Sequence, residues 1–170
     1  MAKDAYTVFI VDDDTKTLTM MKHYLEKNSE YRLNIHTFAT GEDALNKLDL
    51  DPEVVILDYY FNGIDQGAKN GMEILKKVKE KKPDAGIVML SGQDNMEIAL
   101  GTIREGAYDY IIKNDSAVMR TQITTDKILH NRNREHLLNE YKKGLRITII
   151  IMIIFILAMI GFVIYASTGS

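Results

Sequence analysis

Five side chains that suit phosphate chemistry lie at the ends of short apolar runs: Asp12, Asp13, Asp58, Ser91 and Lys113. Carboxylates that lie close together raise each other's pKa unless a cation sits among them. A site with few carboxylates suits Mg²⁺, which keeps part of its water shell and shares phosphate oxygens. A carboxylate can also attack phosphorus and become an aspartyl phosphate. A lysine and a hydroxyl can stabilise the oxygens of the transferred group.

Each of these residue types, taken alone, has an ordinary structural explanation. A single Asp at the end of a strand is usually a turn or cap residue. A lone Lys usually lies in solvent, and a Ser after a strand usually caps a turn or helix. The chemical interpretation therefore depends on whether the fold brings all five side chains together.

The periodicity of apolar residues alternates between strands and helices over residues 6–130. Strands are predicted at 6–11, 33–38, 54–57, 86–90 and 108–112, and helices at 15–28, 41–50, 70–82, 95–105 and from 116 onward. This alternation predicts an α/β fold with a parallel sheet covered by helices on both faces. Five strands favour the doubly wound, flavodoxin-like order 2-1-3-4-5. Right-handed crossovers then place the loops after the strands along one edge, where ligands bind in such sheets.

Several segments of the sequence resemble the response-regulator receiver family, namely 8–14, 54–58, 71–75, 87–92 and 106–113. The resemblance covers about residues 5 to 130. It implies that Asp58 accepts a phosphoryl group from a sensor histidine kinase or a phosphotransfer protein. It also implies a Mg²⁺ site made by Asp12, Asp13, Asp58 and the backbone carbonyl of Tyr60.

The resemblance further implies a switch. Ser91 moves toward the phosphoryl group, Lys113 binds it, and Tyr110 changes rotamer together with Ser91. The output surface of the family lies on the fourth helix, fifth strand and fifth helix, where it contacts an output protein or a second copy of the chain. Such a chain catalyses at most its own phosphorylation and dephosphorylation, so it is not expected to be an enzyme acting on another substrate.

The sequence departs from the family pattern at two places near the site. The family usually has Met-Pro and a nearby Gly after the acceptor, whereas Gly71 lies 13 residues after Asp58 here, which lengthens the loop 62–70. Asn114 stands where the family usually has a Pro with a cis peptide bond. A cis bond without Pro costs about 3 kcal/mol, so we expect a trans bond and a small shift of Lys113.

Residues 147–165 contain no charged side chain over 19 positions. A helix of this length spans about 28 Å, close to the thickness of the apolar part of a bilayer. A buried core helix is the alternative, but a small domain has no core that could surround a helix apolar on every face. The sequence therefore predicts one transmembrane helix, with a short tail at 166–170.

A basic helical stalk is predicted at 131–146, directly before this segment. The stalk could be a nucleic-acid arm, but its position favours the positive flank of a membrane span. The predicted chain is thus a receiver domain at 1–130, in the cytoplasm, held at the cytoplasmic membrane by a single pass. No nucleic-acid partner is expected, and the net charge of -3 agrees with this. Since only stalk and span follow the receiver, we expect a protein–protein output or onward phosphotransfer.

Other functional classes have weaker support. The chain has no Cys, which excludes disulfides and thiol nucleophiles. Aspartyl-phosphate hydrolases carry a second Asp two residues after the nucleophile, and that position is Tyr60 here. The remaining rival is a membrane-tethered docking or scaffold module that keeps the receiver fold without phosphorylation. The long loop and Asn114 favour this rival, and the complete set of five site residues argues against it.

Overall fold

The computed structural model of the chain describes residues 4–61 and 70–168, with their side chains except at 136, 139, 140 and 156–168. The chain forms two compact units, residues 1–130 and 131–170, and each is described by itself. The elements in chain order are β1 (Tyr6–Val11), α1 (Thr15–Asn28), β2 (Leu33–Phe38), α2 (Gly41–Asn46), η1 (Leu48–Leu50), β3 (Val54–Asp58), α3 (Gly71–Lys81), β4 (Gly86–Ser91), α4 (Met96–Arg104), β5 (Asp109–Ile112) and α5 (Ala117–Thr168).

The strands form one parallel sheet in the order β2-β1-β3-β4-β5. This confirms the predicted doubly wound order. β1, β3 and β4 are buried along their whole length, which is typical of parallel strands covered on both faces. The register pairs Val11 with Leu57 and Asp58 with Leu90, so the carboxyl ends of these strands lie along one edge.

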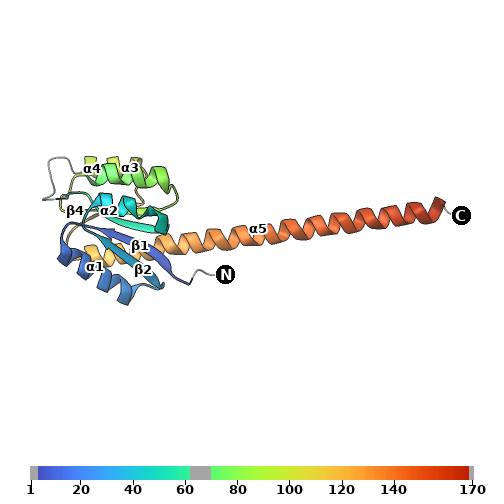
Figure 1. Cartoon of the computed structure of the whole chain (residues 1–170), viewed down its shortest axis with the longest axis horizontal. Coiled ribbons are helices and arrows are strands. Elements are labelled where there is room, and N and C mark those ends of the chain that lie inside the picture. Colours follow the sequence, from blue (N-terminus) through green and yellow to red (C-terminus); the bar gives the residue numbers. More distant parts are fainter. Residues whose placement is uncertain (1–3, 62–69, 169–170) are drawn as a thin grey trace. The chain divides into compact units, whose positions relative to one another are not determined.

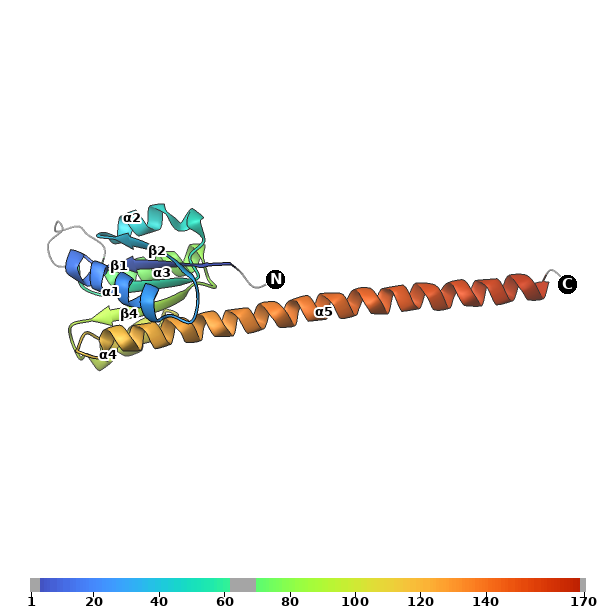
Figure 2. The same cartoon turned by 90° about the horizontal axis from the view of Figure 1, so that it is seen from below.

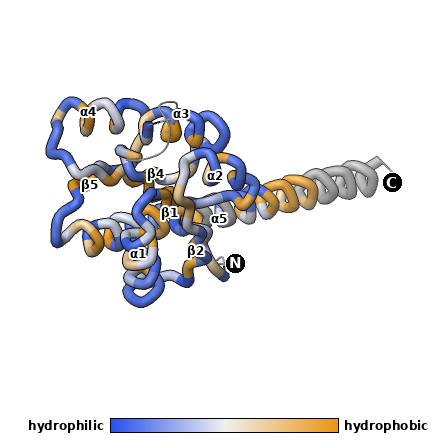
Figure 3. The backbone as a smooth tube through the Cα atoms, turned by 60° about the vertical axis from the view of Figure 1, so that its left-hand side comes forward, coloured by the Kyte–Doolittle hydropathy of each residue, from blue (hydrophilic) through white to orange (hydrophobic). Residues whose placement is uncertain are grey.

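Alternate side chains of the strands enter two separate cores. Val8, Ile10 and Ile56 pack with the buried faces of α1 and α5, for example with Leu25 and Leu129. The intervening strand residues pack on the other face against α2 and α3. Figures 1 and 2 show α1 and the beginning of α5 on the same face of the sheet, and Figure 3 shows the hydrophobic residues gathered in the strands between the layers. The two-residue period of the strands therefore produces the helix-sheet-helix layers.

One predicted helix is wrong in its extent, because the segment 41–50 forms two short elements. α2 ends at Asn46, and η1 is a separate 3₁₀ turn that ends at Asp51 with a left-handed φ of 54°. Pro52 follows Asp51 in the sequence, and a residue before Pro avoids the right-handed helical region. The chain therefore leaves the helix here, and Asp tolerates the left-handed conformation better than most residues do.

The C-terminal helix α5 runs as one element from Ala117 to Thr168. Within the part of the chain that the structure describes, no helix has the length and apolar character needed to cross a membrane, so the predicted span finds no support there. That span, 147–165, extends beyond Phe155, the last residue with a described side chain. Its C-terminal half and the tail thus lie outside the described side chains, and the span stays a prediction.

Candidate functional site

The carboxyl edge of the sheet brings the predicted site residues together. Asp12 follows β1, and Asp58 ends β3. Ser91 ends β4, and Lys113 follows β5, where its backbone N–H donates to the Ser91 carbonyl at 2.7 Å. The order of the strands therefore places residues that are up to about 100 positions apart at one edge, as the alternating pattern predicts.

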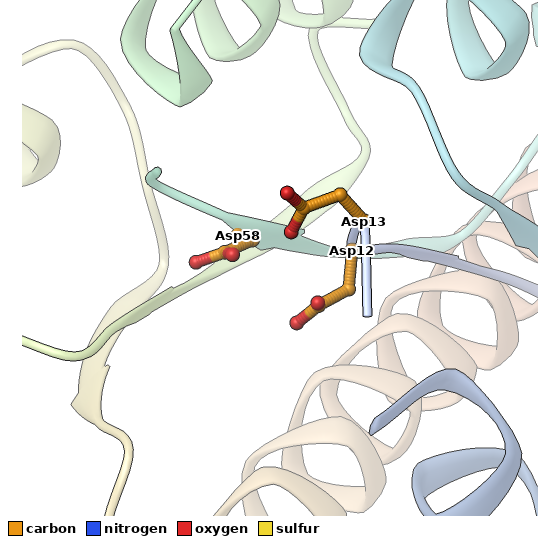
Figure 4. Close-up of side chains that lie close together, drawn as sticks. All are labelled: Asp12, Asp13 and Asp58. Atoms are coloured by element: carbon orange, nitrogen blue, oxygen red, sulfur yellow. The ribbon is translucent and has the colours of Figure 1, made fainter. Parts of the chain in front are cut away.

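Three carboxylates form a cluster at this edge. Asp12, Asp13 and Asp58 each offer an oxygen, and these oxygens lie within 4.8 Å of one another. Figure 4 shows the three side chains next to one another. Asp12 and Asp58 are buried, whereas Asp13 is half-buried. An all-oxygen donor set of this kind fits Mg²⁺, which binds to a few carboxylates and completes its shell with water or phosphate oxygens.

Lys113 joins two of the three carboxylates. Its Nζ lies 2.8 Å from Asp12 Oδ2 and 2.8 Å from Asp58 Oδ2. Burial lowers the pKa of the Lys113 ammonium, but the hydrogen bonds and charges of Asp12 and Asp58 more than reverse this, and its pKa is raised overall. Lys113 is therefore fully charged at neutral pH and offsets part of the repulsion between the carboxylates.

Asp12 and Asp14 lie on either side of Asp13 and have different structural roles. Asp12 Oδ1 accepts from the Asp14 backbone N–H at 2.9 Å, which fixes the buried carboxylate toward the cluster. Asp14 instead caps α1, since its side chain accepts from the backbone N–H groups of Lys16 and Thr17. The Thr17 hydroxyl and these N–H groups lower the pKa of Asp14.

The trans peptide bond predicted at Asn114 is confirmed, since no described peptide bond is cis. Lys113 still reaches both carboxylates. The Asn114 side chain accepts from the Ser116 backbone N–H at 3.0 Å and from its hydroxyl at 2.9 Å. Asn114 thus organises the turn before α5, and the absence of Pro does not separate Lys113 from the cluster.

Burial raises the pKa of Asp58 to about 6, and Asp12 adds to this, while Lys113 and the Tyr60 N–H act in the opposite direction. In a chelator, a ¹³C carboxyl titration of Asp58 should therefore have its midpoint near pH 6. In the unfolded chain the same carboxyl group has the ordinary Asp pKa of 3.8. The native state binds the proton more tightly, so this contribution to stability is complete below about pH 4 and is lost as the pH rises through 6.

The loss amounts to at most about 3 kcal/mol of unfolding free energy, since each pKa unit corresponds to 1.36 kcal/mol. Denaturant unfolding of the wild type and of Asp58→Asn at several pH values isolates this group. The difference between the two proteins should change with pH between 4 and 7 and be constant above that range. A wild-type midpoint at 4 or below would contradict the burial argument.

Gly71, the first residue of α3, packs against the backbone that carries the acceptor. A Cβ atom at Gly71 would clash with the Asp58 carbonyl oxygen and lie 2.7 Å from Tyr59 Cα. The Gly71 N–H donates to the Tyr59 carbonyl at 3.0 Å, so α3 starts directly against the end of β3. The sequence marks this Gly only by its position after the acceptor, and its crowding is visible only in the fold.

Gly71→Ala should therefore destabilise the protein by about 2 kcal/mol, because backbone atoms must move to admit the methyl group. Gly92→Ala is the matched control, since a Cβ atom at Gly92 meets nothing within 4 Å. Urea unfolding of both variants measures the difference. Equal unfolding free energies for the two variants would show that α3 can shift away from Asp58 at little cost.

Gln93 is a residue of the site that the sequence interpretation missed. Its backbone carbonyl accepts from the Tyr110 hydroxyl at 2.9 Å and from the Ser91 hydroxyl at 3.3 Å. Its N–H donates to the Ser91 hydroxyl at 3.2 Å, and its side-chain Oε1 accepts from the Tyr60 hydroxyl at 3.0 Å. The one signal in the sequence that could have identified Gln93 is its position two residues after Ser91.

The predicted role of the Tyr60 carbonyl as a metal ligand stays a prediction. The lengthened loop lies largely outside the described residues, at 62–69.

Comparison with known proteins gives one consistent family. The family model for the response regulator receiver domain matches residues 8–124. The transcriptional regulatory protein CssR of Bacillus subtilis is 32% identical over 110 residues, which cover 64% of this chain and 45% of that protein. The nitrogen assimilation regulatory protein NtrX of Azorhizobium caulinodans is 28% identical over 140 residues, or 82% of this chain and 29% of that protein. The chain therefore spans less than half the length of these curated relatives.

The solved structures agree with this fold. The receiver domain of NtrX from Brucella abortus superposes with a TM-score of 0.62 and 28% identity, covering 72% of this chain and 98% of that one. The BeF3-activated receiver domain of DrrB, a protein of Thermotoga maritima, also has a TM-score of 0.62 and 28% identity and covers 74% of this chain.

Proposed function

Because this chain belongs to the response regulator receiver family, we propose that Asp58 accepts a phosphoryl group from a sensor histidine kinase or a phosphotransfer protein. The observation that carries the proposal is the Asp58 carboxylate itself, which lies at the carboxyl edge of the sheet with Lys113 Nζ at 2.8 Å and two further carboxylates beside it. In this step an Asp58 oxygen forms a bond to phosphorus, and the phosphorus–nitrogen bond of the phosphohistidine breaks. The electron pair of that bond returns to the imidazole nitrogen.

The carboxylates fit a divalent cation. Asp12, Asp13 and Asp58 supply oxygen ligands, and the Tyr60 backbone carbonyl is the proposed fourth ligand. A bound Mg²⁺ neutralises charge on the phosphoryl oxygens. Lys113 and the Ser91 hydroxyl are proposed to bind the remaining oxygens. Because Lys113 already contacts Asp58, its charge is in place before the reaction begins.

The output surface is proposed on α4, β5 and the beginning of α5. Apolar side chains are exposed there at regular helical spacing, with Met96, Leu100 and Ile103 on α4 and Met119 and Ile123 on α5. Spacings of three and four residues place them in one stripe on each helix. An output protein or a second copy of the chain binds this surface after Ser91 and Tyr110 rearrange.

We further propose that residues 147–165 hold the protein in the cytoplasmic membrane as a single pass, after a stalk at 131–146, with the receiver domain at 1–130 in the cytoplasm and a tail at 166–170. The support is the run of 19 positions without charge and the basic residues before it. Detergent-free lysis tests this proposal. The full-length chain should sediment with membranes, and a chain that stays in the soluble fraction would contradict the anchor.

Intact mass spectrometry tests the central proposal. The purified chain is incubated with acetyl phosphate and Mg²⁺, beside a sample in chelator and beside Asp58→Asn. A gain of one phosphoryl group that requires both Mg²⁺ and Asp58 supports the switch. If the folded protein gains no phosphoryl group, the phosphorylation switch is replaced by the alternative function, a docking or scaffold module that works without phosphorylation.

A further inference from the structure

We propose that the part of α5 beyond residue 130 forms a parallel two-stranded coiled coil with the same helix of a second copy of the chain. The seam of this coiled coil contains Leu138, Tyr141 and Leu145, whose side chains are 52%, 71% and 49% exposed in the single chain. The inference does not depend on phosphorylation. It concerns a different surface from the output surface proposed on α4, β5 and the beginning of α5.

The apolar residues of the stalk have the spacing of a coiled-coil seam. Leu138 and Leu145 are seven residues apart, and Tyr141 lies between them at spacings of three and four. These spacings correspond to positions a and d of a heptad repeat, and they form a narrower stripe than a helix that packs on a globular core. In the same repeat, Asn131 occupies position a and Arg134 occupies position d.

An exposed helix of this kind depends on a partner for its stability. Most helices are stabilised by burial of an apolar face, because the backbone hydrogen bonds of an isolated helix are only marginally stable in water. Gly144 weakens the helix further, by about 1 kcal/mol relative to Ala. A Cβ atom at Gly144 would meet no atom of the described chain within 4 Å, so crowding within the chain does not require Gly there. Position 144 lies beside the seam, where Gly allows a second helix to approach closely.

The distribution of polar residues favours a parallel pair over an antiparallel one. Asn131 and Arg134 occupy the seam at one end of the stalk, whereas residues 147–155 are uncharged and almost entirely apolar. An antiparallel pair centred on Tyr141 would place Asn131 and Arg134 against this apolar segment, where their polar groups lose water without gaining partners. In a parallel pair Asn131 faces Asn131 of the other copy, and an Asn at position a specifies the register of a coiled coil.

Charge complementarity supports a second copy as the occupant of the seam. In a parallel pair the two Arg134 side chains lie in one layer, where their like charges repel each other. Glu135 occupies the next position, e, which borders position d of the other helix. Each Glu135 carboxylate therefore lies beside the Arg134 guanidinium of the other copy. Both side chains are exposed in the single chain, so the pair gains two complementary contacts across the seam.

Cysteine cross-linking of the full-length chain in detergent micelles tests this proposal, because the chain has no Cys of its own. Leu138→Cys and Leu145→Cys each place a thiol at position a, whereas Lys143→Cys and Arg146→Cys place it at positions f and b, on the outer side. A disulfide requires that the two Cα atoms lie within about 7 Å of each other. On mild oxidation, both position-a variants should form disulfide dimers, and both control variants should stay monomeric. An antiparallel pair would align at most one of the two a positions with itself.

Light scattering of the chain in detergent gives a second measurement without introduced thiols. The protein mass should be twice 19.4 kDa, with or without Mg²⁺ and acetyl phosphate, and equally so in Asp58→Asn. Leu138→Lys buries two like charges in the seam and should weaken dimerisation by about a hundredfold or more. Met20→Lys is the matched control, since Met20 is a similarly exposed apolar residue on α1, and this variant should dimerise like the wild type.

Three results would overturn the coiled coil. They are equal cross-linking at positions a and f, cross-linking at only one of the two a positions, and a wild type that is monomeric, which would leave the seam to a helix of a different protein. Dimerisation that requires both a phosphodonor and Asp58 would also overturn it and would favour a contact through the proposed output surface. A dimer with this cross-linking pattern supports the coiled coil even if Asp58 is never phosphorylated, so the two proposals fail separately.

Discussion

Lys113→Met is expected to slow the phosphorylation of Asp58 by about a hundredfold or more. Lys113 Nζ lies 2.8 Å from Asp58 Oδ2 and places a positive charge directly beside the acceptor. The loss of one preorganised donor from a reacting group costs about 10²- to 10³-fold in rate. Met keeps the unbranched apolar stem of the side chain, so the change removes the charge with little change in packing. Intact mass measured at successive times with acetyl phosphate and Mg²⁺ gives the rate.

Lys82→Met is the matched control for this substitution. Lys82 also pairs with a carboxylate, since its Nζ lies 2.6 Å from Asp51 Oδ1, but it lies after α3 and before β4 begins, at the other edge of the sheet. The phosphorylation rate of Lys82→Met should equal that of the wild type. The Lys113 variant should also titrate Asp58 above pH 6, because Lys113 lowers the pKa of that carboxyl group. A rate within about threefold of the wild type would remove Lys113 from the proposed mechanism.

Asp13→Asn is expected to weaken Mg²⁺ binding by about tenfold or more. Asp13 contributes an oxygen to the carboxylate cluster, while the ion pairs of Lys113 go to Asp12 and Asp58. The substitution therefore removes one negative charge from the metal site and leaves the Lys113 contacts intact. Even supporting residues outside the ligand shell change metal affinity by about 10- to 100-fold, so a ligand should have at least that effect. Isothermal titration with Mg²⁺ measures it.

Asp14→Asn serves as the neighbouring control. Asp14 caps α1, and Asn caps a helix about as well as Asp does. Its Mg²⁺ affinity should stay within about twofold of the wild type, because Asp14 is not a member of the cluster. Equal losses at positions 13 and 14 would mean that the metal responds only to the overall charge of this loop, and the assignment of Asp13 as a ligand would be abandoned.

The sequence predicts the sheet well because burial on both faces imposes a simple pattern. β1, β3 and β4 are buried throughout, and the chemical residues lie at the end of each apolar run or directly after it. The order of the strands then follows from right-handed crossovers, and it brings Lys113 to Asp58. Local periodicity and connection rules thus suffice to assemble the acceptor, the carboxylates and the lysine.

The features that the sequence does not predict depend on contacts between distant residues. Gln93 is a polar loop residue, and its importance arises from hydroxyls 33 residues before it and 17 residues after it. The end of η1 at Asp51 depends on Pro52, the next residue, which a count of apolar positions over 41–50 ignores. The crowding of Gly71 against Asp58 likewise exists only after α3 has docked on β3.

The backbone hydrogen bond from Gly71 to Tyr59 has a consequence for how the chain tolerates insertions. The Gly71 N lies 3.0 Å from the Tyr59 carbonyl oxygen, so the bond holds the two ends of the segment between these residues together beside Asp58. The entropy of closing such a segment rises only slowly, by about 0.6 kcal/mol for each doubling of its length. The length of chain between the two fastened ends can therefore vary through evolution without displacing Asp58, and the same segment is a suitable place to insert an epitope or a fluorescent label.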